Sequence, residues 1–223
     1  MFIINYKNYD EISGAKAAKL ASIAGAAATK YGVKIAIAPP HHLLSAIKRY
    51  SGLVLAQHVD NAKVGSTTGF VIPELLKKSK IHGSLVNHSE HRIPAKDIAE
   101  LVKRLRALKM ISVVCVKNVS EAAKYAKLNP NYIAIEPPEL IGSGKAVSAE
   151  RPELITGAVK AVKAAKNSTK LLCGAGIVAG QDVKKAIELG SSGILVASGI
   201  VKAKNWSKIV EEFAMAMLKT RSN

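Results

Sequence analysis

One carboxylate lies where a buried strand has to stop. The apolar run Tyr132–Ile135 is followed by Glu136, and then at once by Pro137-Pro138. Such a run predicts a buried strand, and proline lacks the amide donor that continued strand pairing needs. The glycine-rich Gly142-Ser143-Gly144 and the cation Lys145 come next. Glu136 is therefore expected at the end of a strand, beneath a loop that could close over it, as a catalytic base with a lid would be.

Apolar strand-like runs and helix-like segments alternate along the whole chain. The expected strands are Phe2–Tyr6, Lys34–Ala38, Leu53–Gln57, Gly83–Val86, Ile111–Val116, Tyr132–Ile135, Lys170–Cys173 and Gly193–Ala197. The expected helices are Ile12–Tyr31, Leu43–Tyr50, Pro73–Lys78, Pro94–Leu108, Val119–Leu128, Pro152–Lys166, Asp182–Leu189 and Trp206–Leu218.

Eight βα units joined by short connections imply a parallel sheet with right-handed crossovers. Such a sheet closes into a (β/α)8 barrel, for which 223 residues is near the lower limit of length. A doubly wound open sheet is the alternative, but no Gly-x-Gly-x-x-Gly motif follows the first expected strand. The apolar content of 48% is enough for a sizeable core, and no linker-like shift in composition interrupts the chain. We therefore expect an α/β protein with one barrel domain over residues 1–223.

In a (β/α)8 barrel the chemistry gathers at the carboxyl ends of the strands. The polar or glycine-rich strand ends are Asn5-Tyr6-Lys7, Asn87-His88-Ser89-Glu90, Glu136, Gly174-Ala175-Gly176 and Ala197-Ser198-Gly199. Backbone amides in the last two loops favour an anion such as phosphate. The pattern predicts proton abstraction from a small phosphorylated metabolite, with Glu136 as the base and with His88 and Lys7 polarising a carbonyl group.

Each of these features has an ordinary explanation when it is taken alone. A lysine such as Lys7 at a strand end is most often solvated, and His88 could be a satisfied polar residue. Glu90 could form a structural ion pair with Arg92 or with a nearby lysine. Glycine-rich turns are common in proteins of every function. The prediction depends on all five features falling at the same end of five different strands.

The net charge of +17 is the unusual feature of the composition. A strong positive potential can steer anionic substrates or hold nucleic acid. The basic residues are spread along the chain, and only three Phe and one Trp are present, which argues against a base-stacking platform. Solvated basic helix faces are the simpler interpretation. Cys115 and Cys173 end apolar runs and are expected to be buried free thiols. Without a membrane-length apolar run or a signal peptide, a cytoplasmic protein is expected.

The chain resembles the triosephosphate isomerases, and in its shortness and local motifs the archaeal branch of that family. The matching motifs are Asn5-x-Lys7, GSTTG at 65–69, NHSEHR at 87–92, EPPELIGSGK at 136–145, CGAGI at 173–177 and VASG at 196–199. They occur in the order of the family and cover residues 5 to about 204. An isolated Asn-x-Lys has no weight, whereas His-Ser-Glu together with EPPELIGSGK is highly specific. Three residues depart from the common pattern of the family. Asn87 stands where Gly is common, His91 where Arg or Asn is common, and Phe70 where an acidic residue is common.

The resemblance implies a TIM barrel that interconverts dihydroxyacetone phosphate and glyceraldehyde 3-phosphate through an enediol, in glycolysis and gluconeogenesis. It needs no metal or organic cofactor. The implied catalytic residues are Glu136, His88 and Lys7. The implied substrate-binding residues are Asn5, Tyr6, Lys7, Ile141, Gly142, Gly176, Ala197 and Ser198, supported by Ser89, Glu90 and Thr68. Pro137–Lys145 would be the closing lid.

The resemblance also implies self-association. The long segment His58–Val71 enters a pocket of a neighbouring subunit in the family, where the threonine matched by Thr68 supports the partner's site. A homo-oligomer is therefore expected, as a dimer or a tetramer. Other functions stay open at this point. An aldolase would need a Schiff-base lysine inside a strand, and no expected strand has one. A nucleic-acid-binding barrel is disfavoured by the spread charge and the scarce aromatic residues.

Overall fold

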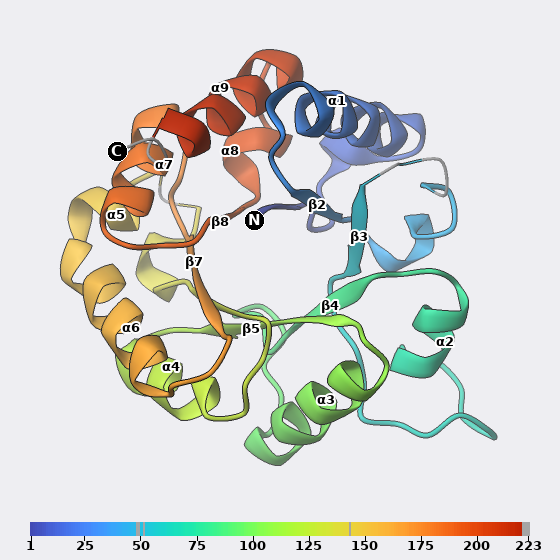
Figure 1. The fold of residues 1–223 in the computed structure, drawn as a ribbon. Coiled ribbons are helices and arrows are strands. Elements are labelled where there is room, and N and C mark those ends of the chain that lie inside the picture. Colours follow the sequence, from blue (N-terminus) through green and yellow to red (C-terminus); the bar gives the residue numbers. More distant parts are fainter. Residues whose placement is uncertain (48–49, 51, 143, 220–223) are drawn as a thin grey trace.

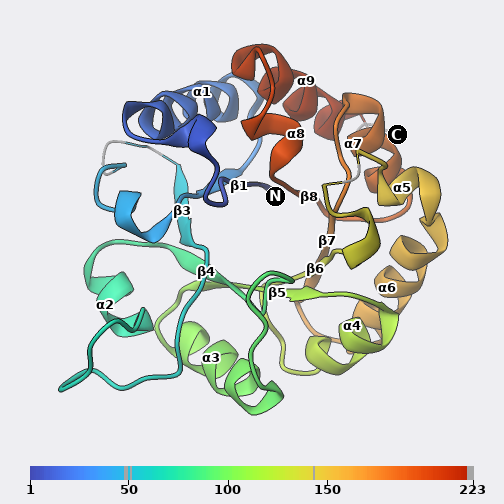
Figure 2. The same ribbon diagram turned by 180° about the vertical axis from the view of Figure 1, so that it is seen from behind.

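The computed structural model describes residues 1–47, 50, 52–142 and 144–219. Eight parallel strands form a closed barrel in chain order, in which β8 pairs with β1, and helices surround it (Figure 1; Figure 2). The strands are β1 (Phe2–Asn5), β2 (Ile35–Ala38), β3 (Leu53–Ala56), β4 (Gly83–Val86), β5 (Ile111–Val116), β6 (Tyr132–Ile135), β7 (Lys170–Gly174) and β8 (Ile194–Val196). The predicted (β/α)8 barrel is confirmed.

The helices lie outside the barrel and follow the strands in sequence. They are α1 (Ala15–Tyr31), α2 (Pro73–Lys78), α3 (Ala95–Ala107), α4 (Val119–Ala126), α5 (Val147–Glu150), α6 (Pro152–Ala164), α7 (Gly180–Glu188), α8 (Ser198–Val201) and α9 (Trp206–Lys219). Short 3₁₀ helices cover Asp10–Ile12, His41–Leu43 and Pro138–Leu140. No helix in the described part of the chain is long and apolar enough to span a membrane.

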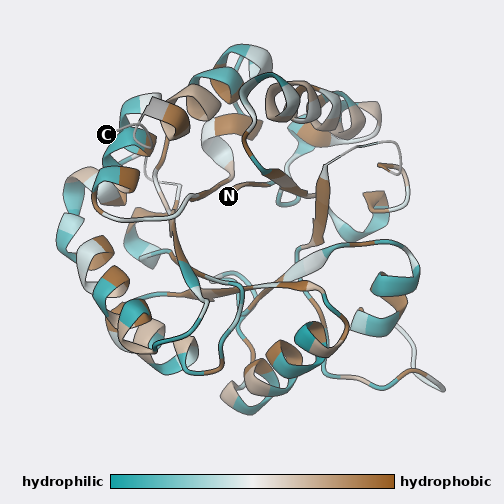
Figure 3. Ribbon diagram, in the orientation of Figure 1, coloured by the Kyte–Doolittle hydropathy of each residue, from teal (hydrophilic) through white to brown (hydrophobic). Residues whose placement is uncertain are grey.

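Alternation along each strand divides the core into two layers. On β1, Ile3 faces the barrel interior with Leu85, Val113 and other inward residues. The neighbouring Phe2 packs in the larger cluster between strands and helices. Successive side chains of a strand point to opposite faces, so both faces of these strands are apolar and buried. Figure 3 shows the result as a largely hydrophobic ring of strands with hydrophilic colour on the outer helices.

Local sequence explains why the surrounding helices form where they do. The buried positions of α3 are Ile98, Leu101, Val102 and Leu105, a spacing that places one apolar stripe against the barrel. α4 begins after Asn118, whose side chain accepts a hydrogen bond from the Glu121 amide at 2.9 Å. Such caps satisfy an amide that the first helical turn leaves unpaired.

One expected helix is wrong. Within Leu43–Tyr50, the described residues form the end of a 3₁₀ helix and a series of turns to Ile47, whereas residues 48 and 49 lie outside the described residues. The Tyr50 hydroxyl donates to the carbonyl of Ile35 at 3.1 Å, and this contact holds the segment against β2. Both cysteines are free and buried, as predicted.

Candidate active site

Three side chains from different strands meet at the carboxyl end of the barrel. His88 Nε2 lies 3.6 Å from Glu136 Oε2 and 3.5 Å from Asn5 Nδ2. Asn5, His88 and Glu136 are all buried, with at most 7% of their surface exposed. The ends of β1, β4 and β6 thus place an amide, an imidazole and a carboxylate around one point.

The tautomer of His88 follows from its neighbours. The backbone amide of Glu90 donates to His88 Nδ1 at 3.3 Å, so that nitrogen carries no proton. The Lys7 amide donates to Asn5 Oδ1 at 3.0 Å, which turns the Asn5 amino group toward His88. A neutral imidazole cannot accept at both nitrogens. The two candidate bonds are the one from the Glu90 amide to Nδ1, at 3.3 Å, and the one from the Asn5 amino group to Nε2, at 3.5 Å. We assign the bond to Nδ1, because it is shorter and its donor is a fixed backbone amide. The proton of a neutral His88 then lies on Nε2, facing Glu136.

Lys7 is held by two connections. Its Nζ lies 2.6 Å from Glu90 Oε1, so Glu90 pairs with a lysine, while Arg92 approaches Glu121 at 3.5 Å. The Lys7 backbone has a positive φ of 47°, a region that non-glycine residues rarely adopt. The side chain of Gln57 donates to the Lys7 carbonyl at 3.0 Å, which fixes this turn. Sequence reasoning missed Gln57 because no motif singles it out.

The turn after β4 is anchored by Asn87. Its side-chain amino group donates to the carbonyl of Cys115 at 3.0 Å, and its Oδ1 accepts from the Ile93 amide at 3.2 Å. Asn87 also has a positive φ of 61°, which explains why glycine is an alternative here. The side chain therefore replaces the conformational freedom of glycine with two hydrogen bonds that position His88.

Glu136 is enclosed but incompletely paired. Its Oε2 is buried and has no hydrogen-bond partner among the described residues. A Cβ at Gly174 would lie 2.5 Å from Glu136 Cγ, so β7 needs glycine at that position to leave room for the carboxylate. Burial, followed by the charge of Glu136, raises the pKa of the Cys115 thiol far above its ordinary value. A thiol held neutral beside Glu136 adds no competing negative charge.

A small cavity of about 30 Å³ lies beside Glu136. Its lining residues are Lys7, Glu136, Ile141, Gly142, Ala175, Gly176, Ile177, Leu195, Val196, Ala197, Ser198 and Gly199. A space of this size holds about one water molecule, so a phosphorylated metabolite requires the segment over it to move. The expected lid includes Ser143, which lies outside the described residues.

Gly176 marks the closest backbone approach in this cavity. Its φ is 69°, and a Cβ there would meet the Lys145 carbonyl oxygen at 1.8 Å. A side chain would therefore force the loop after β7 away from the expected lid. Gly176, with Ala197 and Ser198 at the start of α8, forms the small-residue wall predicted to hold an anion.

A larger cavity of about 570 Å³ opens on the other side of Lys7. It is lined by Asn5, Lys7, Asn8, Tyr9, His41, His42, Gln57, His58, His88, Glu90 and His91. Because Lys7 lines both cavities, the two spaces meet at the same mouth. The described residues contain no group of three or more His, Cys, Asp or Glu placed to hold a metal ion.

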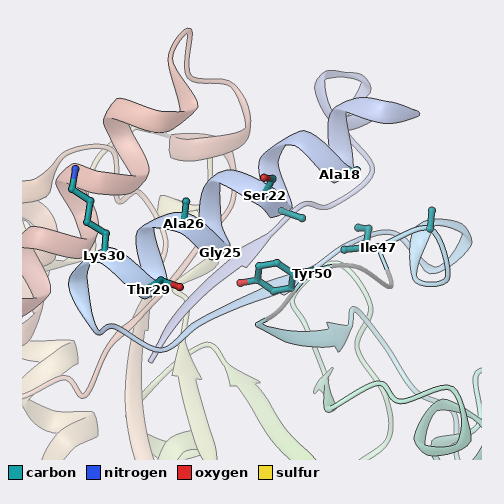
Figure 4. Close-up of a pocket in the computed structure, with 10 residues that line it drawn as sticks. Ala18, Ser22, Gly25, Ala26, Thr29, Lys30, Ile47 and Tyr50 are labelled. Atoms are coloured by element: carbon teal, nitrogen blue, oxygen red, sulfur yellow. The ribbon is translucent and has the colours of Figure 1, made fainter.

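A further cavity, of about 670 Å³, lies away from the mouth between α1 and the turns that end at Tyr50 (Figure 4). Its lining includes Ser22, Gly25, Ala26 and Thr29 of α1. The described part of this lining holds no carboxylate, imidazole or thiol. The carboxylate and imidazole groups described above line the two cavities beside Lys7 instead.

Two expected site residues lie away from the mouth. Tyr6 is fully buried in the layer between strands and helices, and its hydroxyl donates to the carbonyl of Ala17 at 3.4 Å. Thr68, which is predicted to support the site of a neighbouring subunit and not its own, is exposed in the long segment after β3. Ser89 follows His88, and its buried hydroxyl has no hydrogen-bond partner within the described residues.

Comparison with known proteins agrees with the motifs. A family model described as triosephosphate isomerase matches residues 1–213. A triosephosphate isomerase of Cenarchaeum symbiosum is 59% identical over 217 residues, which cover 97% of both chains. Those of Methanothermus fervidus (45% over 218 residues, 97% of this chain and 98% of that one) and Archaeoglobus fulgidus (46% over 211 residues, 94% and 95%) are also similar. The predicted resemblance is confirmed, and the chain belongs to the triosephosphate isomerase family.

Proposed function

We propose that this chain interconverts dihydroxyacetone phosphate and glyceraldehyde 3-phosphate, with Glu136 as the base that carries the proton between the two substrate carbons. The observation that carries the proposal is the 3.6 Å approach of His88 Nε2 to Glu136 Oε2 beside Lys7 and a glycine-lined cavity. A carboxylate base with a neutral histidine electrophile is the established pairing of this family.

The reaction divides into two proton transfers at each group. The Glu136 carboxylate takes the C1 proton of dihydroxyacetone phosphate while the C2 carbonyl oxygen becomes the enediolate oxygen. His88 donates its Nε2 proton to that oxygen and then recovers a proton from the C1 hydroxyl. Glu136 finally returns its proton to C2, which yields the aldehyde. Both residues end in their starting states, so no cofactor is required.

Positive charge and backbone amides would stabilise the negative charges of the enediolate and of the substrate phosphate. Lys7 lies where it could neutralise the enediolate and the phosphate. Amides near Gly142, Gly176 and Ser198 would hold the phosphate, as loop and helix N-terminal amides commonly do. Closure of the Pro137–Lys145 segment would exclude water and prevent the enediolate from eliminating phosphate.

A homo-oligomer is part of the proposal. Val64 and Phe70 are 52% and 53% exposed in the segment between β3 and α2, and Thr68 lies between them. They are the two most exposed large apolar side chains among the described residues, and a partner that covered them would remove this apolar surface from water. The cavity of about 570 Å³ beside Lys7 and Glu90 is a polar space that such a segment of a second copy could enter. Light scattering would distinguish a dimer from a tetramer, and a monomer would reject this part of the proposal.

We place the protein in the cytoplasm, where its proposed substrates are made and used. We also propose that residues 1–223 fold as one domain, because the first strand closes the barrel against the last. A single cooperative unfolding transition is then expected.

The test of function is a coupled assay with glyceraldehyde 3-phosphate. Wild-type protein should turn over the substrate, and Glu136→Gln should lose about 10²-fold or more in kcat, the usual size of a general-base contribution. Glu188→Gln is the matched control, because Glu188 is 44% exposed and pairs with Lys184 at the C-terminal end of α7, on the side of the barrel opposite the mouth. A loss of only a few-fold in Glu136→Gln would reject the mechanism.

A further inference from the structure

Two histidines stack beside the proposed active site. The rings of His58 and His91 have centroids 3.8 Å apart and planes inclined by 12°. His58 follows β3 and is buried, whereas His91 follows β4 and lies open to solvent above it. The two residues are far apart in sequence, so the stack joins two loops of the barrel mouth.

The His58 side of the stack is firmly held. Its Nε2 lies 3.1 Å from Asp60 Oδ1, and its backbone carbonyl accepts from His41 Nε2 at 3.2 Å. Asp60 in turn accepts from the Val71 amide at 2.7 Å through its other carboxylate oxygen. His58 therefore belongs to a rigid closure at the base of the segment 58–71.

The His91 side leads to the reacting groups. The His91 amide donates to the His88 carbonyl at 2.8 Å, which closes a turn over residues 88–91. Within that turn, Glu90 donates its amide to His88 Nδ1 and pairs with Lys7. Moving His91 would therefore move the donor that sets the His88 tautomer and the carboxylate that holds Lys7.

We propose that the His58–His91 stack positions the 88–91 turn, and that protonation of both rings releases it and lowers isomerase activity. His91 is on this account a positioning residue, since it touches neither reacting carbon. The proposal rests on the proposed function for its activity readout, and on the stack alone for its titration readout.

The charges around the stack set how it titrates. Asp60, on its own segment, contacts His58. The other titratable groups that share the cavity with the stack are His41 and His42 after β2, Lys7 and Tyr9 after β1, and His88 and Glu90 on the 88–91 turn, and Arg92 follows His91 in the sequence. The negative charge of Asp60, next to His58, favours the binding of one proton by the His58–His91 pair. A second proton would place two cations in contact, which is unfavourable even with partial exposure to solvent. Burial lowers the pKa of His58 despite its hydrogen bond to Asp60, so the stack is neutral at His58 under neutral conditions.

Two substitutions at His91 separate stacking from charge. His91→Phe keeps an aromatic ring over His58 but binds no proton, and His91→Asn removes the ring. His82→Asn is the control, because His82 is exposed just before β4, at the end of the barrel opposite the mouth, and takes no part in the stack. Each protein is assayed for kcat and KM at pH 7.5 and pH 5.5, at a concentration where light scattering gives the same mass. The titration of the substrate phosphate is common to all four proteins and cancels in the comparison.

The stack predicts opposite behaviour for the two variants. His91→Phe should match the wild type in kcat at pH 7.5. Between pH 7.5 and pH 5.5, the factor by which its kcat falls should be smaller than the wild-type factor by about threefold or more. His91→Asn should already lose about threefold or more in kcat at pH 7.5, with KM little changed, because misplaced catalytic groups slow the chemical step. His82→Asn should follow the wild type at both pH values.

Ring-proton NMR titration tests the same idea without activity. In the wild type, the charge of His91 should lower the midpoint at which the His58 signal titrates, and the chemical shift of His88 should change along with that of His58. In His91→Phe, His58 should titrate in one step at a higher midpoint, and the accompanying His88 shift should vanish. Superimposable wild-type and variant pH profiles, or an unchanged His58 midpoint in both variants, would overturn the proposal. If the wild type has no isomerase activity, the proposed function fails, and the ring titrations alone then decide whether the stack is coupled to His88.

Discussion

The two halves of the barrel mouth differ in how completely their polar groups are paired. On the side of β1 and β4, Lys7 pairs with Glu90, and the Glu90 amide fixes His88. On the side of β6 to β8, the buried Oε2 of Glu136 lacks a hydrogen-bond partner in the part of the chain that the structure describes. One half is assembled by the protein itself, and the other is left for substrate and lid to complete.

The difference has a physical meaning. A buried polar atom without a partner costs free energy, and native structures keep few of them. Oxygen lone pairs that the protein does not occupy are free to take a proton from a substrate carbon. The electrophile and the cation, by contrast, must be in place before charge develops, because preorganised dipoles need no rearrangement during the reaction.

Breaking the assembled half at its centre should have the largest effect. His88→Asn removes the Nε2 donor that faces Glu136, and we expect kcat to fall about 10²- to 10⁴-fold, the usual range for proton transfer by a positioned side chain. KM should change far less, since the phosphate contacts remain. Steady-state kinetics in both directions would measure this. A loss below tenfold would mean that the paired half does not carry the electrophile.

Crowding the unpaired half of the mouth should have the second-largest effect on the rate. Gly174→Ala puts a methyl carbon 2.5 Å from Glu136 Cγ, closer than two such carbons can approach, so the Glu136 side chain must shift. A displacement near 1 Å can cost about 10²-fold in rate. The matched control is Gly157→Ala on α6, where a Cβ would lie 3.1 Å from a methyl group of Val119, outside the mouth. Equal kinetics for the two variants would contradict the account of Glu136.

Loosening Lys7 should have a moderate effect. Glu90→Gln removes the partner of Lys7, but the Glu90 side chain is 57% exposed, and an exposed ion pair is worth at most about 1 kcal/mol. We therefore expect KM to rise up to about fivefold with a similar or smaller loss in kcat. Glu100→Gln, which removes the 3.9 Å contact to Lys103 on the exposed face of α3, is the control. A loss as large as that of His88→Asn would show that Glu90 acts directly on substrate.

Acid should lower the stability of the fold slightly through His58, which lies on the assembled side of the mouth. Burial lowers the pKa of His58 from its ordinary value of 6.5. The unfolded chain then binds this proton more readily, so the free energy of unfolding falls as the pH drops below about 6.5, until folded His58 is itself protonated. For one proton the slope cannot exceed about 1.4 kcal/mol per pH unit. Urea unfolding of wild type and His58→Asn between pH 7.5 and 5.5 should show a shallower slope in the variant, and a steeper one would contradict this.

Much of the fold was predictable because its strands are short apolar runs with sharp ends. β4, β5 and β6 begin and end at the expected residues. The expected helix at Leu43–Tyr50 is wrong because tertiary contacts override weak local spacing, as the Tyr50 bond to Ile35 illustrates. The four-residue helices α5 and α8 are too short to show a periodic pattern.

The candidate site was predictable only in its outline. Strand ends named Lys7, His88 and Glu136, and the structure brings them to one mouth. Tyr6 does not lie at the mouth with them. Alternation along the first strand could have predicted this, because Ile3 and Asn5 point inward and Tyr6 therefore points outward. No local pattern could reveal Gln57, the choice of Lys7 over Arg92 as the partner of Glu90, or the His58–His91 stack, because each depends on loops that only the closed barrel brings together.

The most direct test of the central claim follows the proton itself. Dihydroxyacetone phosphate is converted in D₂O, and NMR measures deuterium at C2 of the glyceraldehyde 3-phosphate that forms. If Glu136 carries the proton, it exchanges with solvent before delivery, so the wild type should label C2 and Glu136→Gln should do so about 10²-fold more slowly or worse. Labelling by Glu136→Gln within a few-fold of the wild-type rate would contradict the assignment of Glu136 as the base.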